Sequence, residues 1–225
     1  MEEKRLFDIL KLYIAKYPNQ EIALAKKESG NWRKFSIQEY VEITNNISYA
    51  LIELGIKKDA KVGIVCNNRP EWNMLDMAIM QVGAITVPIY PTISKEDYNY
   101  IINDCGVKLV VLEGQAVLQK IESVKANTPS LTAIYTIGTK SEHPSFEQLV
   151  EIGKNNPNPE ELKNREDSVD EKDCATIIYT SGTTGNPKGV MLSHYNIMSQ
   201  IHNLKQTPST WSKKAFSFLP ICHAY

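Results

Sequence analysis

Residues 179–194 read YTSGTTGNPKGVMLSH, and this stretch carries the most information about the fold and chemistry of the chain. Three glycines, Gly182, Gly185 and Gly189, stand among hydroxyl residues, and one cation, Lys188, follows a proline. Glycine allows positive φ and a close approach of the backbone to a ligand, and successive backbone N–H groups can then point at one anion. Hydroxyl groups and the compact charge of lysine add further donors, so the stretch predicts a polyphosphate site.

The residues on either side of this loop predict two strands, with a helix only after the second. Residues 175–179 (ATIIY) and 190–192 (VML) are apolar and strand-like, and Ser193 is suited to cap the following helix. The stretch is not a Walker A loop, because that motif places four residues between its first glycine and a Gly-Lys-Ser/Thr turn. An ordinary surface hairpin is the alternative, but it does not require four hydroxyls, three glycines and a lysine together.

The rest of the chain alternates between strand-like and helical segments. Strands are predicted at 61–66, 85–89, 108–112 and 131–137, and helices at 71–82, 115–126, 145–155 and after a Ser94–Asp97 cap. This alternation predicts an α/β fold class, a layered α/β/α domain with a mostly parallel sheet. Before it we expect a helix within 6–17, a hairpin around Ser29 and Gly30, and a helix that begins with a Ser36–Glu39 capping box.

We expect three regions along the chain. Residues 1–154 would form an N-terminal α/β subdomain, and residues 155–173, which are polar and contain two Asn-Pro pairs, a linker or surface excursion. Residues 174–225 would be the phosphate-loop segment that opens a second subdomain. A strand is predicted at 216–219, and the loop after it stops at Tyr225, which indicates the N-terminal fragment of a longer protein.

Composition excludes several classes of function. The chain has 225 residues and a formal net charge of −1, which argues against nucleic acid or an anionic membrane as its main partner. It has no apolar run of about 20 residues and no signal-peptide pattern. Four cysteines without a Cys-x-x-Cys pair give no zinc signature, and a reducing cytoplasm is the simplest setting.

The stretch at 179–194 resembles the phosphate-loop signature of the adenylate-forming (AMP-forming) superfamily, which includes acyl-CoA synthetases, luciferases and peptide-synthetase adenylation domains. Residues 67–72 (NNRPEW), 83–92 (GAITVPIYPT) and 218–225 (FLPICHAY) are similar to long-chain fatty acyl-CoA synthetases specifically. The resemblance spans essentially the whole chain. It implies an enzyme that activates a fatty acid with ATP and Mg²⁺ to acyl-AMP and pyrophosphate, and then forms acyl-CoA with coenzyme A as the second substrate.

The resemblance also implies site residues. The contacts to the β- and γ-phosphates fall on one run of residues: Thr180, Ser181, Gly182, Thr183, Thr184 and Gly185. Thr184 would contact phosphate or the magnesium shell, and Lys188 would offset negative charge on the departing pyrophosphate. His223 would border the acyl and adenylate pocket, with a purely structural histidine as the alternative. Lys188, Thr184 and His223 are therefore the candidate catalytic residues, while His143, His194 and His202 are expected to be structural.

Two other interpretations stay open at this point. Within the superfamily the chain could belong to a medium-chain synthetase or to an acyl-AMP ligase that loads a carrier protein. From another class, it could be a catalytically inert binding or scaffold module. The expected partners are small molecules and not nucleic acid; a peripheral membrane contact of the parent protein and self-association of this chain through exposed sheet edges are left open.

We predict that this chain alone does not make acyl-CoA. The resemblance places the later acidic motif, the ribose-binding aspartate and the mobile C-terminal domain with its lysine beyond Tyr225. An assay of the purified chain for fatty-acid-dependent AMP release checks this, and release above the rate without fatty acid would contradict it.

Overall fold

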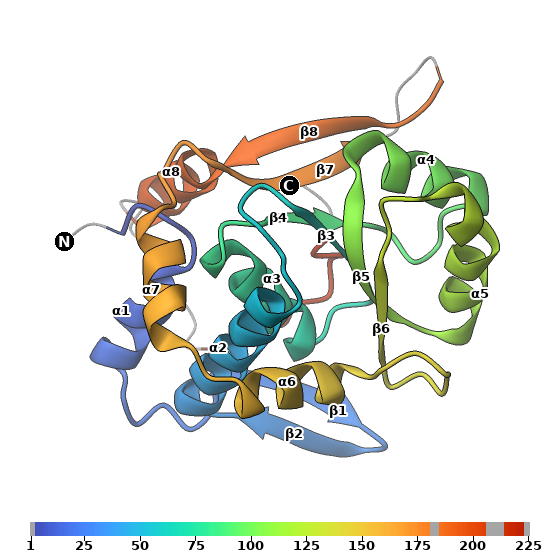
Figure 1. Ribbon diagram of the computed structural model, residues 1–225. Helices are drawn as coiled ribbons and strands as arrows, with labels where there is room; N and C mark the ends of the chain where they lie inside the picture. The colour runs from blue at the N-terminus through green and yellow to red at the C-terminus, as the bar shows by residue number, and fades with distance from the viewer. Residues whose placement is uncertain (1–2, 181–184, 206–213, 223–225) are drawn as a thin grey trace.

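The computed structural model describes residues 3–180, 185–205 and 214–222 (Figure 1). Along the chain the elements are α1 (Asp8–Lys16), β1 (Leu24–Glu28), β2 (Asn31–Phe35), α2 (Ile37–Glu53), β3 (Lys61–Val65), α3 (Pro70–Gln81), β4 (Ile85–Pro88), α4 (Lys95–Cys105) and β5 (Val107–Glu113). They are followed by α5 (Gln115–Val124), the 3-10 turn η1 (Lys125–Asn127), β6 (Ala133–Ile137), α6 (Phe146–Asn155), α7 (Pro159–Asp167), β7 (Cys174–Thr180), β8 (Lys188–Ser193) and α8 (His194–Lys205).

Six strands form the central sheet in the order β6–β5–β3–β4–β7–β8. The ladders from β6 to β7 are all parallel, and β8 pairs antiparallel with β7. The strands β1 and β2 form a separate antiparallel hairpin, as the sequence predicts. The α/β class with a mostly parallel sheet is confirmed.

Alternate side chains of the parallel strands enter two different apolar clusters. In β5, Leu109 and Val111 pack with residues of α2, α3 and α6, whereas Val110 and Leu112 pack with residues of α4 and α5. Figure 1 shows these two groups of helices on opposite sides of the sheet. Successive side chains of a strand point to opposite faces, so helices on both sides bury the middle of these strands on both faces. This is why the strands read as continuous apolar runs.

Serine residues begin three of the helices that cover the sheet. Capping boxes are formed by Ser36 with Glu39 before α2, by Ser94 with Asp97 before α4, and by Ser145 with Gln148 before α6. In each box the serine hydroxyl accepts from the backbone N–H three residues on, and that residue's side chain accepts from the serine N–H. The first two boxes confirm the predictions from sequence.

Part of the expected polar linker, residues 155–173, is a helix. The side chain of Asn158 accepts a hydrogen bond from the Glu161 N–H (3.1 Å) and begins α7, with Pro159 at its first position. Leu162 and Glu166, four residues apart, are 6% and 4% exposed. One face of α7 is therefore packed on the domain, and the segment is not a free connection. The division of the chain into subdomains stays a prediction.

The prediction of a strand at 216–219 is wrong. Residues 214–222 contain no strand, and Phe216 and Phe218 are 79% and 70% exposed. The apolar stretch around them suits a strand, but a strand needs a neighbouring ladder, and within the described residues none pairs with this segment. Among the described helices, none has the length and apolar character required to cross a bilayer.

Gly153 lets α6 lie directly on the backbone of α2. A Cβ atom at this position would stand 1.6 Å from the carbonyl oxygen of Asn46 and 2.9 Å from the backbone nitrogen of Ala50. Both neighbours are backbone atoms of a helix, so no side-chain rotation relieves the clash. The glycine is required by the distance between the two helices, not by its own φ.

We predict that Gly153→Ala destabilises the chain by about 3 kcal/mol, because α6 must move away from α2. In an unpacked helix the same change would stabilise by about 1 kcal/mol, so the sign of the effect is diagnostic. Urea unfolding followed by circular dichroism measures it, with Lys154→Ala on the exposed side of α6 as the matched control. Equal or greater stability of Gly153→Ala would contradict the close contact.

Candidate functional site

The predicted phosphate loop joins the antiparallel strands β7 and β8. Thr180, the last residue of β7, pairs with Lys188, the first residue of β8, and Tyr179 pairs with Gly189. The strand–loop–strand arrangement and the later start of α8 are as the sequence predicts. Of the predicted phosphate contacts, the structure describes Thr180, Gly185 and Lys188. Ser181, Gly182, Thr183 and Thr184 lie outside the described residues, as does His223.

The loop lies at the edge of the sheet where ligands of open α/β proteins bind. The strands β3, β4, β5, β6 and β7 run in the same direction, so their carboxyl ends meet at one edge. The crevice outside this edge is the usual ligand site of such sheets. The loop after β7 and the loop after β3 both leave the sheet here, and we call this place the carboxyl edge.

Thr180 and Lys188 face each other across the base of the loop. Directly opposed residues of an antiparallel pair carry their side chains on the same face, so Thr180 and Lys188 project from one face of the hairpin. Both side chains are exposed. Among the described carboxylates, none forms an ion pair with Lys188. The positive charge is thus available to an anion held by the loop.

The two described glycines of this hairpin serve different needs. Gly185 has φ of 124°, in the region that side chains disfavour, so the loop's path depends on it. A Cβ atom on Gly189 would come within 2.8 Å of Ile177 and 3.1 Å of the Tyr179 ring. Gly189 therefore leaves room for the side chains of Ile177 and Tyr179 on the neighbouring strand β7.

Tyr179 ties the hairpin to helix α4. Its phenol hydroxyl donates a hydrogen bond to the carboxylate of Asp104, and its ring meets Tyr100 edge-on at 6.5 Å. Burial, together with the neighbouring Asp104 carboxylate, raises the pKa of Tyr179 well above its usual range, so the phenol remains a donor. The sequence gives no sign of this contact, because Asp104 is an ordinary polar residue near the end of a helix.

A second group of charges fixes the loop after β3. Glu71, 3% exposed, accepts hydrogen bonds from Arg69 (3.0 Å) and from Lys26 of the β1–β2 hairpin. Arg69 also pairs with Glu113 at the end of β5, whose other oxygen accepts from the Asn67 N–H at 3.1 Å. Burial opposes the charge of Glu71, but the hydrogen bonds from Arg69 and Lys26 outweigh it and lower the pKa of this carboxyl to about 2. Arg69 belongs to the NNRPEW stretch, but the sequence alone does not indicate its ion pairs with Glu71 and Glu113.

The segment 214–222 returns to the carboxyl edge beside this loop. The side chain of Asn68 forms hydrogen bonds with Ser217, Leu219 and Ile221 of the segment. Cys222 is 5% exposed, and burial raises the pKa of its thiol. A buried, protonated thiol is a poor nucleophile.

Among the described histidines, His194 has structural surroundings. His194, 2% exposed, accepts a hydrogen bond from the Leu6 N–H at 3.3 Å and meets the Phe7 ring edge-on. Burial lowers the pKa of His194 to about 4, and the charge of Arg5 acts in the same direction.

In the described part of the chain, no cluster of three or more His, Cys, Asp or Glu side chains could hold a metal ion. Thr184, where a metal contact is expected, lies outside the described residues, so that contact stays a prediction.

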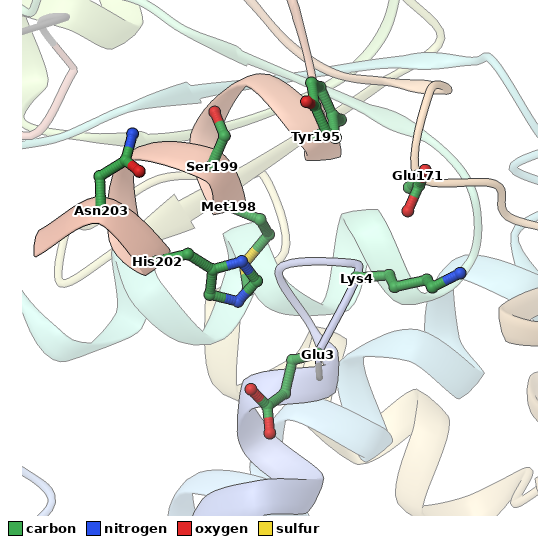
Figure 2. Close-up of a pocket in the computed structure, with 8 residues that line it drawn as sticks. All are labelled: Glu3, Lys4, Glu171, Tyr195, Met198, Ser199, His202 and Asn203. Atoms are coloured by element: carbon green, nitrogen blue, oxygen red, sulfur yellow. The ribbon is translucent and has the colours of Figure 1, made fainter. Parts of the chain in front are cut away.

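A cavity of about 260 Å³ lies away from the carboxyl edge, and residues that line it are drawn in Figure 2. It lies between the N-terminal segment and α8, with Glu3, Tyr195, Met198 and His202 among the residues that line it. Helix α8 follows the far end of β8, whereas the phosphate loop precedes its near end. The cavity is thus separated from Thr180 and Lys188 by the length of a strand.

The family model and the similar proteins identify the same family for this chain. Residues 11–225 match the family model described as AMP-binding enzyme. The chain is 38% identical over 181 residues to long-chain-fatty-acid–CoA ligase ACSBG2 of Xenopus laevis, covering 78% of this chain and 24% of that protein. It is 32% identical over 222 residues to ACSBG1 of Rattus norvegicus, covering 92% of this chain and 30% of that protein. The chain thus spans about a quarter to a third of the length of these relatives.

Solved structures share the fold. A long-chain-fatty-acid-CoA ligase (FadD1) from Archaeoglobus fulgidus superposes with a TM-score of 0.72 at 24% identity, covering 91% of this chain and 39% of that one. The anthranilate CoA ligase AuaEII in complex with anthranoyl-AMP gives a TM-score of 0.69 at 25% identity, covering 85% of this chain and 35% of that one.

We predict that the ion pairs of Glu71 make the stability of the chain sensitive to acid. The folded pKa of about 2 is below the ordinary value of 4.5, so the unfolded state binds more protons as pH falls. The stabilisation is complete above about pH 5 and is lost as pH falls toward 2. Glu71→Gln should cost about 2–3 kcal/mol at neutral pH and flatten this dependence.

Urea unfolding at several pH values between neutral and 3 measures the effect. Glu147→Gln, at an exposed position of α6, is the control and should follow the wild-type curve. Parallel curves for Glu71→Gln and the wild type would show that Glu71 does not carry the acid sensitivity.

Proposed function

The chain belongs to the AMP-binding enzyme family, and we propose that it forms the N-terminal part of a long-chain fatty acid–CoA ligase. The observation that carries the proposal is the β7–β8 hairpin at the carboxyl edge, where Thr180 and Lys188 flank a loop that needs glycine. The names of the relatives support a fatty acid as the substrate that is activated.

The proposed reaction has two steps. In the first, a carboxylate oxygen of the fatty acid attacks the α-phosphorus of ATP, and the bond to the bridging oxygen breaks to release pyrophosphate. In the second, the thiol sulfur of coenzyme A attacks the acyl carbon, and AMP leaves. The difficulty of the first step is the approach of one anion to another, so fixed donors and positive charge near the phosphates lower its barrier.

Each candidate residue has a role in the first step. Thr180, Gly185 and the residues between them bind the β- and γ-phosphates through backbone N–H and hydroxyl groups. Lys188, whose position beside Thr180 suits this role, offsets the charge that develops on pyrophosphate. Thr184 contacts phosphate or the Mg²⁺ that accompanies ATP, and His223 borders the acyl-adenylate. The last two roles rest on the sequence resemblance.

The proposal also implies the substrates, the partners and the cellular compartment of the enzyme. Its substrates are a fatty acid, ATP and coenzyme A, and nucleic acid is not a partner. The four cysteines are free thiols, which fits the reducing cytoplasm. An acyl-AMP ligase that loads a carrier protein is the competing assignment; comparing coenzyme A with a carrier protein as the acceptor separates the two.

We predict that Lys188→Ala in the complete enzyme weakens Mg-ATP binding about 10- to 150-fold, the loss expected for one charge-assisted contact. Isothermal titration calorimetry measures this, beside the same titration of the present chain. Lys108→Ala, at the exposed amino end of β5, is the control and should bind like the wild type. Affinity of Lys188→Ala within about twofold of the wild type would remove Lys188 from the phosphate site.

A further inference from the structure

A second cavity, of about 250 Å³, lies between α1, α2 and α7. Figure 1 shows these helices next to one another. Its apolar walls are formed by Leu10 and Ile14 of α1, Val41 of α2 and Leu162 of α7. Among its described lining residues, none belongs to the β7–β8 hairpin or to the loop after β3. The cavity is therefore separate from the site proposed for the phosphates.

The polar end of this cavity is the carboxylate of Glu166, which is 4% exposed. One carboxylate oxygen accepts a hydrogen bond from the Gln81 side chain at 3.2 Å, and the other accepts from the ammonium group of Lys11. A carboxylate that is buried this deeply needs such donors to remain charged. The end of the cavity is thus built to face a positive charge.

The amide of Gln81 fixes the carboxylate from the protein side. Gln81 is 3% exposed, and its Oε1 accepts a hydrogen bond from the Ser48 hydroxyl at 2.8 Å. Because the oxygen is used, Nε2 is left to donate to Glu166 and, at 3.3 Å, to Asn45. These bonds join α2, α3 and α7, so Glu166 keeps its position when its other partner changes.

Lys11 reaches the same carboxylate from the solvent side. Its side chain is 54% exposed, whereas that of Glu166 is 6% exposed. A lysine stem has several rotatable bonds, so holding it in one geometry costs conformational entropy. Lys11 therefore shows which group the carboxylate accepts, a primary ammonium, and it is also the partner that can be replaced.

The walls and the polar end together suit one class of ligand. A hydrocarbon chain matches the apolar walls, and an ammonium group matches Glu166. The hydroxyl of Tyr49 lines the same cavity; burial raises the pKa of Tyr49, and the charge of Glu166 acts in the same direction, so the hydroxyl stays neutral and offers a second acceptor. Sites for drug-sized ligands enclose about 300–1,000 Å³, so the ligand of this cavity is small.

We propose that this cavity binds a small primary amine with a short hydrocarbon chain, whose ammonium group replaces that of Lys11 on Glu166. The proposal does not depend on the proposed function, because none of these residues takes part in the proposed reaction.

The test uses the complete protein that contains this chain, with hexylamine as the probe. Saturation-transfer NMR, which detects weak binding, should give a Kd of about 1 mM for the wild type. Glu166→Gln keeps the shape of the side chain but removes its charge, so it should weaken binding about tenfold or more. Lys11→Ala removes the competing ammonium and should strengthen binding about tenfold, a change of opposite sign.

Matched controls cover both the protein and the probe. Lys163 also lines the cavity, but it pairs with Asp167, so Lys163→Ala should bind hexylamine like the wild type. Hexan-1-ol has the same hydrocarbon chain without a charge, and it should bind the wild type about tenfold more weakly than hexylamine. Hexanoate, which carries the opposite charge, should not bind.

Each contrary result would overturn the proposal. Absence of hexylamine binding to the wild type would remove the site, and an unchanged affinity in Glu166→Gln would place the amine elsewhere. Equal binding of hexan-1-ol would indicate an apolar cavity that does not recognise the ammonium group, and tighter binding of hexanoate would indicate an anion site. If Lys11→Ala does not fold, Glu166→Gln and the two other probes still decide the question, and none of these results depends on whether the protein activates a fatty acid.

Discussion

Parallel pairing from β6 through β7 forces the carboxyl ends of these strands to one edge of the sheet. Segments that are far apart in the sequence meet there: the loop after β3, the end of β5, the β7–β8 loop and residues 214–222. Helices on both faces bury the strands, so the edge is the place where backbone and polar side chains stay accessible. The chemistry proposed for the chain depends on this geometry.

The buried charge of Glu71 is the second constraint. A carboxylate with 3% exposure is stable as an anion only with partners, and Arg69 and Lys26 are both present. Lys26 belongs to the β1–β2 hairpin, which is outside the main sheet. The ion pairs therefore bind the hairpin, α3 and, through Glu113, β5 into one unit.

Local signals in the sequence predicted most of the fold. The strands follow from apolar runs, and the starts of α2 and α4 follow from the Ser36 and Ser94 boxes, because each depends on residues within one turn. Helix α7 was missed, since a mostly polar segment hides the pair Leu162 and Glu166 that packs inward. The strand at 216–219 was wrong because a strand depends on a partner that no local pattern reveals.

The candidate site, like the fold, depends partly on residues that are close in the sequence and partly on contacts between segments that are far apart in it. Glycine and lysine positions in the β7–β8 loop can be read from one stretch of sequence, and Gly185 and Gly189 have geometric reasons to be glycine. The bonds of Asn68 to Ser217 span 149 positions, and those of Tyr179 to Asp104 span 75. Only the folded sheet brings these pairs together. Tyr179 anchors the β7–β8 hairpin to α4, and Asn68 holds the segment 217–221, so these two parts of the carboxyl edge rest on separate contacts.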